Sequence, residues 1–157
     1  GSSREEAQKF YDNYFAEFKM VKEYFDMVVQ EAYARGYTET MFGRRRYFPA
    51  LRSKLPFIRA QAERQAYNAP LQGTAADIVK IATIRIEAAL GRAQMLNQTH
   101  FLLQVHDELI YEAEEETAVS AATLIKQEMM NVLEHEVPLS VNIEIGPSWG
   151  ELHRLTD

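Results

Sequence analysis

The chain contains no cysteine, which excludes disulfide bonds and metal sites built from thiolates. Its apolar runs are short, and none approaches the roughly 20 residues needed to cross a membrane. A signal-peptide pattern is missing as well. We therefore expect a protein of the cytoplasm with no membrane partner. Gly1-Ser2-Ser3 resembles the remnant of an expression tag.

Glycine (seven residues), proline (five) and tryptophan (one) are sparse among the 157 residues. No linker, internal repeat or low-complexity stretch divides the chain, and its length suits one domain with a sizeable core. Hydrophobic residues make up 46% and charged residues 25%, which is ordinary for a globular domain. The net charge of −6, taken alone, argues against binding to nucleic acid.

Apolar residues recur every three or four positions between Arg4 and Arg35, at Ala7, Phe10, Tyr14, Phe18, Val21, Phe25, Val28 and Ala32. This spacing predicts an amphipathic helix, or two helices joined end to end. Ser3 and Glu6 have the spacing of a capping box at the start, and Gly36 is suited to end the helix. The segment holds more aromatic residues than one buried stripe needs. We expect most of them in the core and some to face a partner domain.

Positive charge gathers in one part of the chain. Seven basic residues and a single acid, Glu63, lie between positions 43 and 64; the basic residues are Arg44, Arg45, Arg46, Arg52, Lys54, Arg59 and Arg64. A strand-like segment at Tyr37–Thr40, a turn at Gly43 and the closing Tyr47-Phe48-Pro49 predict a short, irregular hairpin that carries the three consecutive arginines. Arginine interleaved with aromatic rings suits phosphate and base contacts. The alternative is a solvated basic loop.

Two helices are expected next, one over 57–67 and one from near Leu71 to about Leu90. Pro70 should end or kink the first, and Gly91 should stop the second. Gln72-Gly73-Thr74 would then lie at a helix N-terminus, which favours phosphate. Simple capping is the alternative, and the sequence alone favours it.

A possible catalytic centre lies in the stretch Phe101–Glu112. Two short apolar runs, Phe101–Val105 and Leu109–Tyr111, flank the polar triplet His106-Asp107-Glu108. This pattern predicts a β-hairpin with the triplet at its tip. Adjacent carboxylates on a rigid turn suit Mg²⁺, which is usually held by one or two carboxylates together with substrate phosphates. A solvated turn without function is the alternative, and it is favoured for a hairpin considered in isolation.

The remaining chain predicts a helix over Thr117–Glu134 and a half-buried strand over Leu139–Ile145, where apolar and polar residues alternate. Trp149 is expected to cap the core. The fold class is therefore α+β, with long helices packed on a small antiparallel sheet that includes the Phe101–Glu112 hairpin.

Four stretches, in this order and spacing, resemble family A DNA polymerases of the bacterial DNA polymerase I type. They are Gly43–Pro49 (Gly-Arg-Arg-Arg-Tyr-Phe-Pro), Glu63–Asp77 (Glu-Arg-Gln-Ala-Tyr-Asn-Ala-Pro-Leu-Gln-Gly-Thr-Ala-Ala-Asp), Gln104–Leu109 (Gln-Val-His-Asp-Glu-Leu), which resembles motif C of the palm, and Gly146–Trp149. The segment Arg4–Arg35 also resembles the fingers helices that follow the nucleotide-binding helix. The resemblance covers nearly the whole chain.

The resemblance implies a domain organisation. Residues 1–36 resemble part of the fingers, and residues 37–157 resemble the palm with its motif C hairpin. Together they are expected to form one compact fragment, a partial palm with part of the fingers.

The resemblance also implies roles for individual residues. Asp107 resembles the motif C catalytic aspartate that holds the metals, and Glu108 resembles its supportive neighbour. His106 resembles a residue that contacts the primer end. The other positions that resemble DNA-contacting residues are Arg44, Arg45, Arg46, Arg64, Asn68 and Gln72.

The implied activity is DNA-directed DNA polymerisation in replication and repair, by a two-metal mechanism that uses Mg²⁺. The implied partners are primer-template DNA and a deoxynucleoside triphosphate in the full-length protein, which in bacteria works in the cytoplasm at the nucleoid. In this family a second aspartate, in motif A, completes the metal site. We find neither motif A nor the nucleotide-binding helix in the sequence.

We therefore expect a C-terminal fragment that requires the remaining N-terminal part of the polymerase and is inactive alone. Two alternatives stay open. One is a DNA-binding module without catalysis. The other is a structural fragment without activity, which forms a homodimer through its aromatic helix and an unpaired sheet edge.

Overall fold

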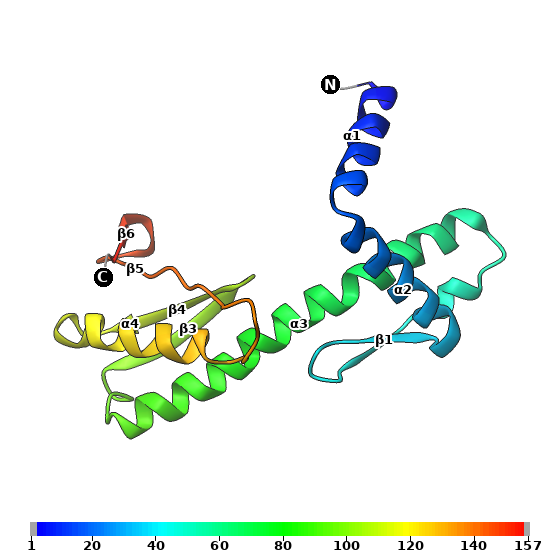
Figure 1. The fold of residues 1–157 in the computed structure, drawn as a ribbon. Coiled ribbons are helices and arrows are strands. Elements are labelled where there is room, and N and C mark those ends of the chain that lie inside the picture. Colours follow the sequence, from blue (N-terminus) through cyan, green and yellow to red (C-terminus); the bar gives the residue numbers. More distant parts are fainter. Residues whose placement is uncertain (1–2, 156–157) are drawn as a thin grey trace. The chain divides into compact units, whose positions relative to one another are not determined.

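The computed structural model describes residues 3–155 and has a mixed α+β architecture (Figure 1). Its elements, in chain order, are α1 (Arg4–Glu17), α2 (Lys19–Arg35), β1 (Tyr37–Glu39), β2 (Arg45–Tyr47), the 3-10 helix η1 (Pro49–Arg52), α3 (Pro56–Arg92), β3 (Thr99–Val105), β4 (Glu108–Ala113), α4 (Glu115–Met130), β5 (Glu144–Ile145), the 3-10 helix η2 (Trp149–Glu151) and β6 (His153–Arg154). The strands form three separate antiparallel pairs, β1–β2, β3–β4 and β5–β6. The predicted α+β class is confirmed, but the expected small sheet around one hairpin is replaced by these three pairs.

The chain divides into two compact units, and the boundary falls inside α3, between Thr74 and Ala75. The first unit contains α1, α2, β1, β2 and the start of α3. The second contains the rest of α3, the β3–β4 hairpin, α4 and the C-terminal strands. This boundary does not coincide with the division after residue 36, which rests on the resemblance and stays a prediction. Gly1 and Ser2 lie outside the described residues.

The N-terminal helices begin and end as the sequence predicts. The backbone N–H of Ser3 donates to Glu6 Oε2 at 2.7 Å, and the N–H of Glu6 donates to Ser3 Oγ at 3.2 Å, which completes the capping box. The helix breaks at Phe18, whose φ of −105° and ψ of 61° are not helical, so the two-helix alternative is the right one. Gly36 ends α2 in the left-handed region at φ 80°, which glycine adopts without a steric cost.

The aromatic residues of α1 are more exposed than expected. Phe10 is 74% exposed and Tyr11 56%, so the prediction that most of these rings lie in the core is wrong for this helix. Some aromatic residues of the N-terminal helices contact other rings instead. Phe25 of α2, for example, stacks on Tyr67 with ring centroids 4.4 Å apart. The core of the first unit lies elsewhere, in Ala32, Phe48, Leu51, Ala62, Ala66 and Ala69.

Helix α3 continues through Pro70, which corrects the expected break. Proline has no N–H, so it cannot donate to the carbonyl four residues earlier, and such a loss costs about 3 kcal/mol in a helix interior. Ala66 and Ala69, which both precede Pro70, are 0% and 7% exposed. Their small side chains pack against Phe48 and Leu51 before the proline, and Arg44 Nη2 donates to the Gly73 carbonyl after it, so tertiary contacts hold both halves in one helix.

The continuous helix also overturns the expected phosphate site at a helix N-terminus. Gln72, Gly73 and Thr74 lie inside α3, where the backbone N–H groups are engaged in the helix. The helix ends one residue beyond the predicted stop at Gly91. Gln94, at φ 60°, takes the left-handed position, and the N–H of Met95 donates to the carbonyl of Leu90 at 2.9 Å.

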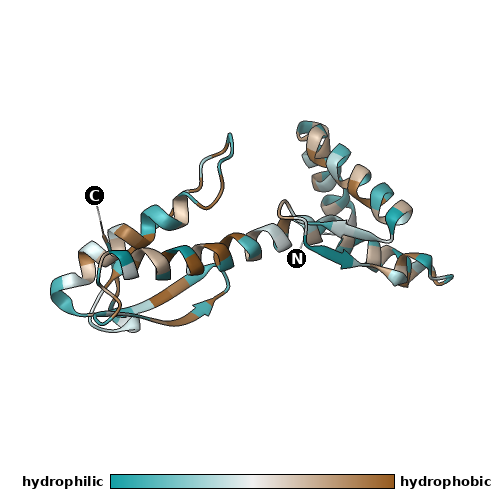
Figure 2. Cartoon of the chain, turned by 90° about the horizontal axis from the view of Figure 1, so that it is seen from below, coloured by the Kyte–Doolittle hydropathy of each residue, from teal (hydrophilic) through white to brown (hydrophobic). Residues whose placement is uncertain are grey.

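The core of the second unit is formed by α3, α4 and one face of the β3–β4 hairpin. Ile86 and Leu90 are fully buried, and Ile125 of α4 is 8% exposed beside them. Leu109 and Tyr111, which lie on the same face of β4, pack against this cluster. Figure 2 shows the hydrophobic colour along this part of α3 and the neighbouring strands. Burial, with a smaller contribution from the charge of Glu87, raises the pKa of Tyr111 to about 12.

The C-terminal segment differs most from the sequence expectation. The alternating stretch Leu139–Ile145 forms a strand only at Glu144–Ile145, which pairs with His153–Arg154 and not with β3 or β4. Trp149 is 59% exposed, so it does not cap the core. No helix among residues 3–155 is long and apolar enough to cross a membrane.

Candidate functional site

The β3–β4 hairpin has a two-residue loop, His106-Asp107, where the sequence suggested a three-residue turn. Val105 pairs directly with Glu108, so Glu108 is the first residue of β4. His106 has a φ of 55°, which is uncommon for a residue with a side chain. The side-chain Nε2 of Gln104 donates to the carbonyl oxygen of His106 at 2.8 Å. The loop is therefore short and braced from the preceding strand.

Both carboxylates of this hairpin are open to solvent, because Asp107 and Glu108 are exposed residues. Glu108 shares a strand face with Ile110, while Leu109 and Tyr111 face the core. Carboxylate oxygens are hard donors of the kind that Mg²⁺ prefers, so the donor chemistry fits this ion. Within residues 3–155 no group of three or more His, Asp or Glu side chains gathers closely enough to hold a metal ion. Within the described residues, the two carboxylates of the hairpin are therefore too few to hold a metal ion by themselves.

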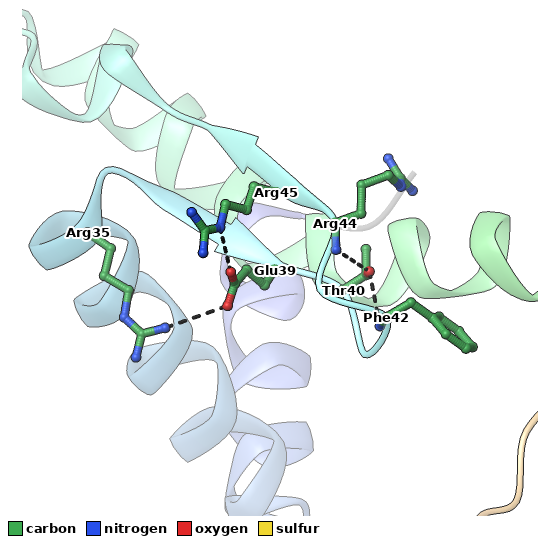
Figure 3. A network of polar contacts seen from close by, with 6 residues as sticks. All are labelled: Arg35, Glu39, Thr40, Phe42, Arg44 and Arg45. Carbon is green, nitrogen blue, oxygen red and sulfur yellow. Dashed lines mark hydrogen bonds and ion pairs between the residues drawn. The ribbon is translucent and has the colours of Figure 1, made fainter.

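The β1–β2 hairpin of the first unit has two different faces. On one face Glu39 pairs with Arg45, and its carboxylate accepts from Arg45 Nε at 2.7 Å and lies 3.8 Å from Arg35 Nη1 (Figure 3). The hydrogen bond to Glu39 raises the pKa of Arg45, whose guanidinium also lies 4.6 Å from the centre of the Tyr37 ring. The guanidinium of Arg45 is therefore paired with Glu39 and Tyr37 of the same hairpin.

The other face of this hairpin meets α3 around a small cavity. The Oγ1 of Thr40 accepts from the backbone N–H of Phe42 at 3.3 Å and of Arg44 at 3.2 Å, which shapes the hairpin tip (Figure 3). Arg44 Nη2 donates to the carbonyl of Gly73 at 3.0 Å, which ties the tip to α3. The cavity, of about 140 Å³, is lined by Thr38, Glu39, Thr40, Arg44, Arg46, Ala69, Gln72 and Gly73.

The predicted DNA-contacting residues are thus only partly gathered together. Arg44, Arg46 and Gln72 line one cavity, whereas Arg45 lies on the opposite hairpin face. Arg64 and Asn68 precede Gln72 on α3 at intervals of four residues, so the three share one side of the helix. Asn68 Nδ2 donates to the Arg64 carbonyl at 2.9 Å.

The carboxylate hairpin and its His106 belong to the second unit and form a separate feature. Sequence reasoning missed the roles of Thr40 and Gln104, which shape or brace the two hairpins. It named Gly73 but placed it at a helix N-terminus, whereas the structure has it inside α3 against the hairpin tip. Gln104 alone gave a signal, since it is a polar residue directly beside the polar triplet in an apolar run.

Substituting Gly73 by alanine should loosen the tip of the β1–β2 hairpin. A β-carbon at this position would lie 2.6 Å from Thr40 Cγ2, so Thr40 would have to rotate and release the two N–H groups that its hydroxyl accepts. Overpacking costs about 1–3 kcal/mol, offset by about 1 kcal/mol of helix propensity. We expect faster amide hydrogen exchange at Phe42 and Arg44.

The matched control is Gly91→Ala in the same helix, where the nearest atom to a new β-carbon, Leu96 Cδ1, is 3.4 Å away. This variant should leave exchange at Phe42 and Arg44 unchanged. Unchanged exchange at these two amides in Gly73→Ala would show that Thr40 does not hold the tip.

Comparison with known proteins decides the family. The family model described as DNA polymerase family A matches residues 1–151. The chain belongs to DNA polymerase family A. It is 43% identical over 151 residues to the thermostable DNA polymerase I of Thermus filiformis, covering 96% of this chain and 18% of that protein. It is 46% identical over 156 residues to the DNA polymerase I of Chloroflexus aurantiacus, covering 99% of this chain and 16% of that protein.

A solved structure agrees with this assignment. The polymerase domain of Pol1 from M. smegmatis, in complex with DNA primer-template and dNTP, matches with a TM-score of 0.82 and 43% sequence identity over 88% of this chain and 24% of that chain. The resemblance to bacterial DNA polymerase I and the α+β fold are thereby confirmed. The chain spans less than a fifth of the curated family A relatives, at 18% and 16% of their lengths. The roles of individual residues stay predictions.

Proposed function

We propose that this chain supplies part of the active site of a DNA-directed DNA polymerase. The observation that carries the proposal is the exposed, braced turn with adjacent carboxylates, Asp107 and Glu108, in a chain of DNA polymerase family A. In the reaction, the 3′-hydroxyl oxygen of a primer forms a bond to the α-phosphorus of a deoxynucleoside triphosphate. The bond between the α-phosphorus and the oxygen that bridges it to the β-phosphorus breaks, that oxygen leaves with pyrophosphate, and the hydroxyl proton passes to water.

Each residue at the turn has its own part in this proposal. Asp107 is the carboxylate that would hold Mg²⁺, Glu108 adds negative charge beside it, and His106 contacts the primer end. Bound Mg²⁺ supplies positive charge for the primer oxygen and for the departing pyrophosphate. The rigid hairpin holds the Asp107 carboxylate in place, so little reorganisation is needed when the substrates arrive.

The first unit would hold DNA in this proposal. Arg44, Arg46 and Gln72 surround one cavity, and Arg64 and Asn68 extend the same side of α3. Guanidinium groups neutralise backbone phosphates, and amide side chains hydrogen-bond to base edges. The protein of M. smegmatis that the chain resembles is described in complex with DNA primer-template and dNTP. Work on DNA in replication and repair would place the protein at the nucleoid, in the bacterial cytoplasm.

The site requires carboxylates from two places, and this chain offers them at one turn. We therefore expect the chain alone to be inactive, and active together with the remaining part of a family A polymerase, which would supply the motif A aspartate. Primer extension with Mg²⁺, measured for the chain, for the remaining part and for their mixture, tests this. Extension only in the mixture supports the proposal. Extension by the chain alone that is lost in Asp107→Ala would contradict the need for a second part.

We expect Arg46 and Arg45, on opposite faces of the β1–β2 hairpin, to contribute differently to the salt dependence of DNA affinity. Replacing Arg46 by alanine should reduce the slope of log affinity against log salt by about 0.9, the loss of one phosphate contact. Replacing Arg45 should change this slope far less, because its guanidinium is already paired with Glu39. Fluorescence anisotropy of a labelled primer-template duplex at several salt concentrations measures both slopes. An equal reduction of the slope in the two variants would show that the hairpin face with the cavity is not the face that binds DNA.

A DNA-binding module without catalysis is the second candidate function. It is favoured by the separation of the chain into two units, because the arginine cavity lies in the first and the carboxylate turn in the second. Self-association is a third outcome, since Phe101, Leu102 and Leu103 of β3 are 40–52% exposed. Sedimentation with and without duplex distinguishes them: a monomer that binds DNA favours the module, and a dimer indifferent to DNA favours self-association.

A further inference from the structure

The loop of the β3–β4 hairpin has a backbone conformation that its residues do not favour by themselves. Only His106, the first of the two loop residues, has a positive φ, at 55°. A positive φ at the first residue alone is the pattern of a type II′ turn, which normally has glycine there. Histidine carries a β-carbon and pays a steric penalty at this position. A further interaction is therefore needed to hold the turn in this form.

The alternative two-residue turn differs mainly in one peptide group. In a type I′ turn both loop residues have a positive φ, and the peptide between them is rotated by about half a turn relative to type II′. In this chain that peptide consists of the His106 carbonyl and the Asp107 N–H. Rotating it reverses the direction of the carbonyl and changes the sign of φ at Asp107. The Asp107 side chain would then leave the backbone in a different direction.

Gln104 contacts the peptide group that distinguishes these forms. Its Nε2 donates to the His106 carbonyl oxygen at 2.8 Å, two residues along the chain. The strand itself holds Gln104 in register, because Gln104 pairs with Leu109, whose side chain packs in the core of the second unit. The donor therefore stands on a fixed strand, and rotation of the loop peptide would break the bond.

We propose that Gln104 is a positioning residue, which locks the His106–Asp107 peptide and so aims the Asp107 carboxylate. This inference rests on the proposed function for its catalytic part, since Asp107 is the residue that would hold Mg²⁺. Gln104 touches neither metal nor substrate in this account. It acts through the backbone of the loop, and its removal should change how well Asp107 is oriented while leaving the charge of the turn intact.

The first test is independent of activity. In the 157-residue chain, Gln104→Met keeps the length of the side chain and removes the donor, while Gln104→Glu keeps the shape and replaces the donor by an acceptor. The type I′ form brings the amide protons of His106 and Asp107 close together, so the cross-relaxation signal between them should rise in both variants. A single exposed hydrogen bond shifts the ratio of the two forms by about two- to tenfold.

Gln127→Met is the matched control, because Gln127 is an exposed glutamine on α4 and does not belong to the hairpin. It should leave the His106–Asp107 signal unchanged. An unchanged signal in both Gln104 variants would overturn the positioning role. A change in Gln127→Met equal to that in Gln104→Met would overturn it as well.

The second test links the turn to catalysis in the polymerase formed from the chain and the remaining part. Gln104→Met should raise the Mg²⁺ concentration needed for half-maximal primer extension severalfold and leave the affinity for primer-template unchanged. Asp107→Asn should reduce extension to background in the same assay, in line with a loss of about a thousandfold in rate. An unchanged Mg²⁺ requirement in Gln104→Met, with Asp107→Asn inactive, would overturn the link from Gln104 to catalysis alone. Full activity in Asp107→Asn would overturn the proposed function, and the catalytic part of this inference with it.

Discussion

Replacing Asp107 by asparagine should slow nucleotide addition by about a thousandfold in the polymerase formed from this chain and the remaining part. Asparagine has nearly the same shape as aspartate, so the hairpin should keep its fold, but the side chain loses its negative charge. The charge stabilisation supplied through a bound metal is worth several kcal/mol, and about 1.4 kcal/mol corresponds to a factor of ten. Single-turnover incorporation of one nucleotide, at saturating primer-template, measures the loss.

The matched control for this prediction is Glu112→Gln. Glu112 is another exposed acid on the same hairpin, near the far end of β4 from the turn. The Glu112→Gln variant should incorporate a nucleotide at a rate close to that of the unchanged chain. If both substitutions reduce the rate to the same degree, the effect comes from the overall charge of the hairpin, and Asp107 has no special place in the site.

Replacing Leu90 by alanine should cost about 2–5 kcal/mol of unfolding free energy in the second unit, as buried leucine truncations do. Leu90 is fully buried and lies in one cluster with Ile86, Ile125 and Val132, so the lost side chain leaves a cavity among neighbours from two helices. Because the chain has two compact units, one global melting curve can average over them. Amide hydrogen exchange along β3, β4 and α4 reports on this unit directly.

Ile84→Ala is the control on the same helix. Ile84 is 71% exposed, so its truncation removes little buried surface and alanine favours the helix. The unfolding free energy measured by amide exchange in β3, β4 and α4 should then stay within about 0.5 kcal/mol of its value in the unchanged chain. A loss in Ile84→Ala as large as that in Leu90→Ala would mean that the assigned core does not stabilise the second unit.

Local signals in the sequence predicted several elements well. Ser3 with Glu6, Gly36 and Gly43 marked helix and turn positions, and each marker depends on backbone geometry within a few residues. The hairpin around Asp107 was predicted for the same reason, since two apolar runs with a polar centre describe a local structure. The loop was nevertheless shorter than expected, because the pairing of Val105 with Glu108 extends β4 by one residue.

Features that depend on distant contacts were not predictable in this way. Pro70 is a strong local signal for a helix break, but tertiary contacts on both sides of it, from Ala66 and Ala69 in the core and from Arg44 to Gly73, outweigh that signal. The alternation in Leu139–Ile145 is that of a half-buried strand, yet a strand also needs a partner, and only the end of this stretch, from Ile143 on, pairs with His153–Arg154 and Leu155.

The arrangement of the candidate DNA-binding residues also depends on contacts that the sequence does not reveal. Three consecutive arginines look equivalent in the sequence, and alternation along β2 then turns Arg45 toward Glu39 while Arg44 and Arg46 line the cavity. The sequence gives no information about which of them is neutralised, because Glu39 meets Arg45 only after the hairpin has formed. The role of Gln104 was not predictable for a related reason. Its partner is a backbone carbonyl, which every residue has, so neither composition nor charge indicates the contact.

The most direct test of the account is a titration of this chain into a fixed amount of the remaining part of a family A polymerase, with Mg²⁺ and a primer-template. Primer extension should be absent without the chain, rise with its concentration and saturate at one chain per remaining part. The same titration with Asp107→Asn should remain at background. Extension that is independent of the chain, or equal for the chain and its Asp107→Asn variant, would contradict the claim that this hairpin provides part of the active site.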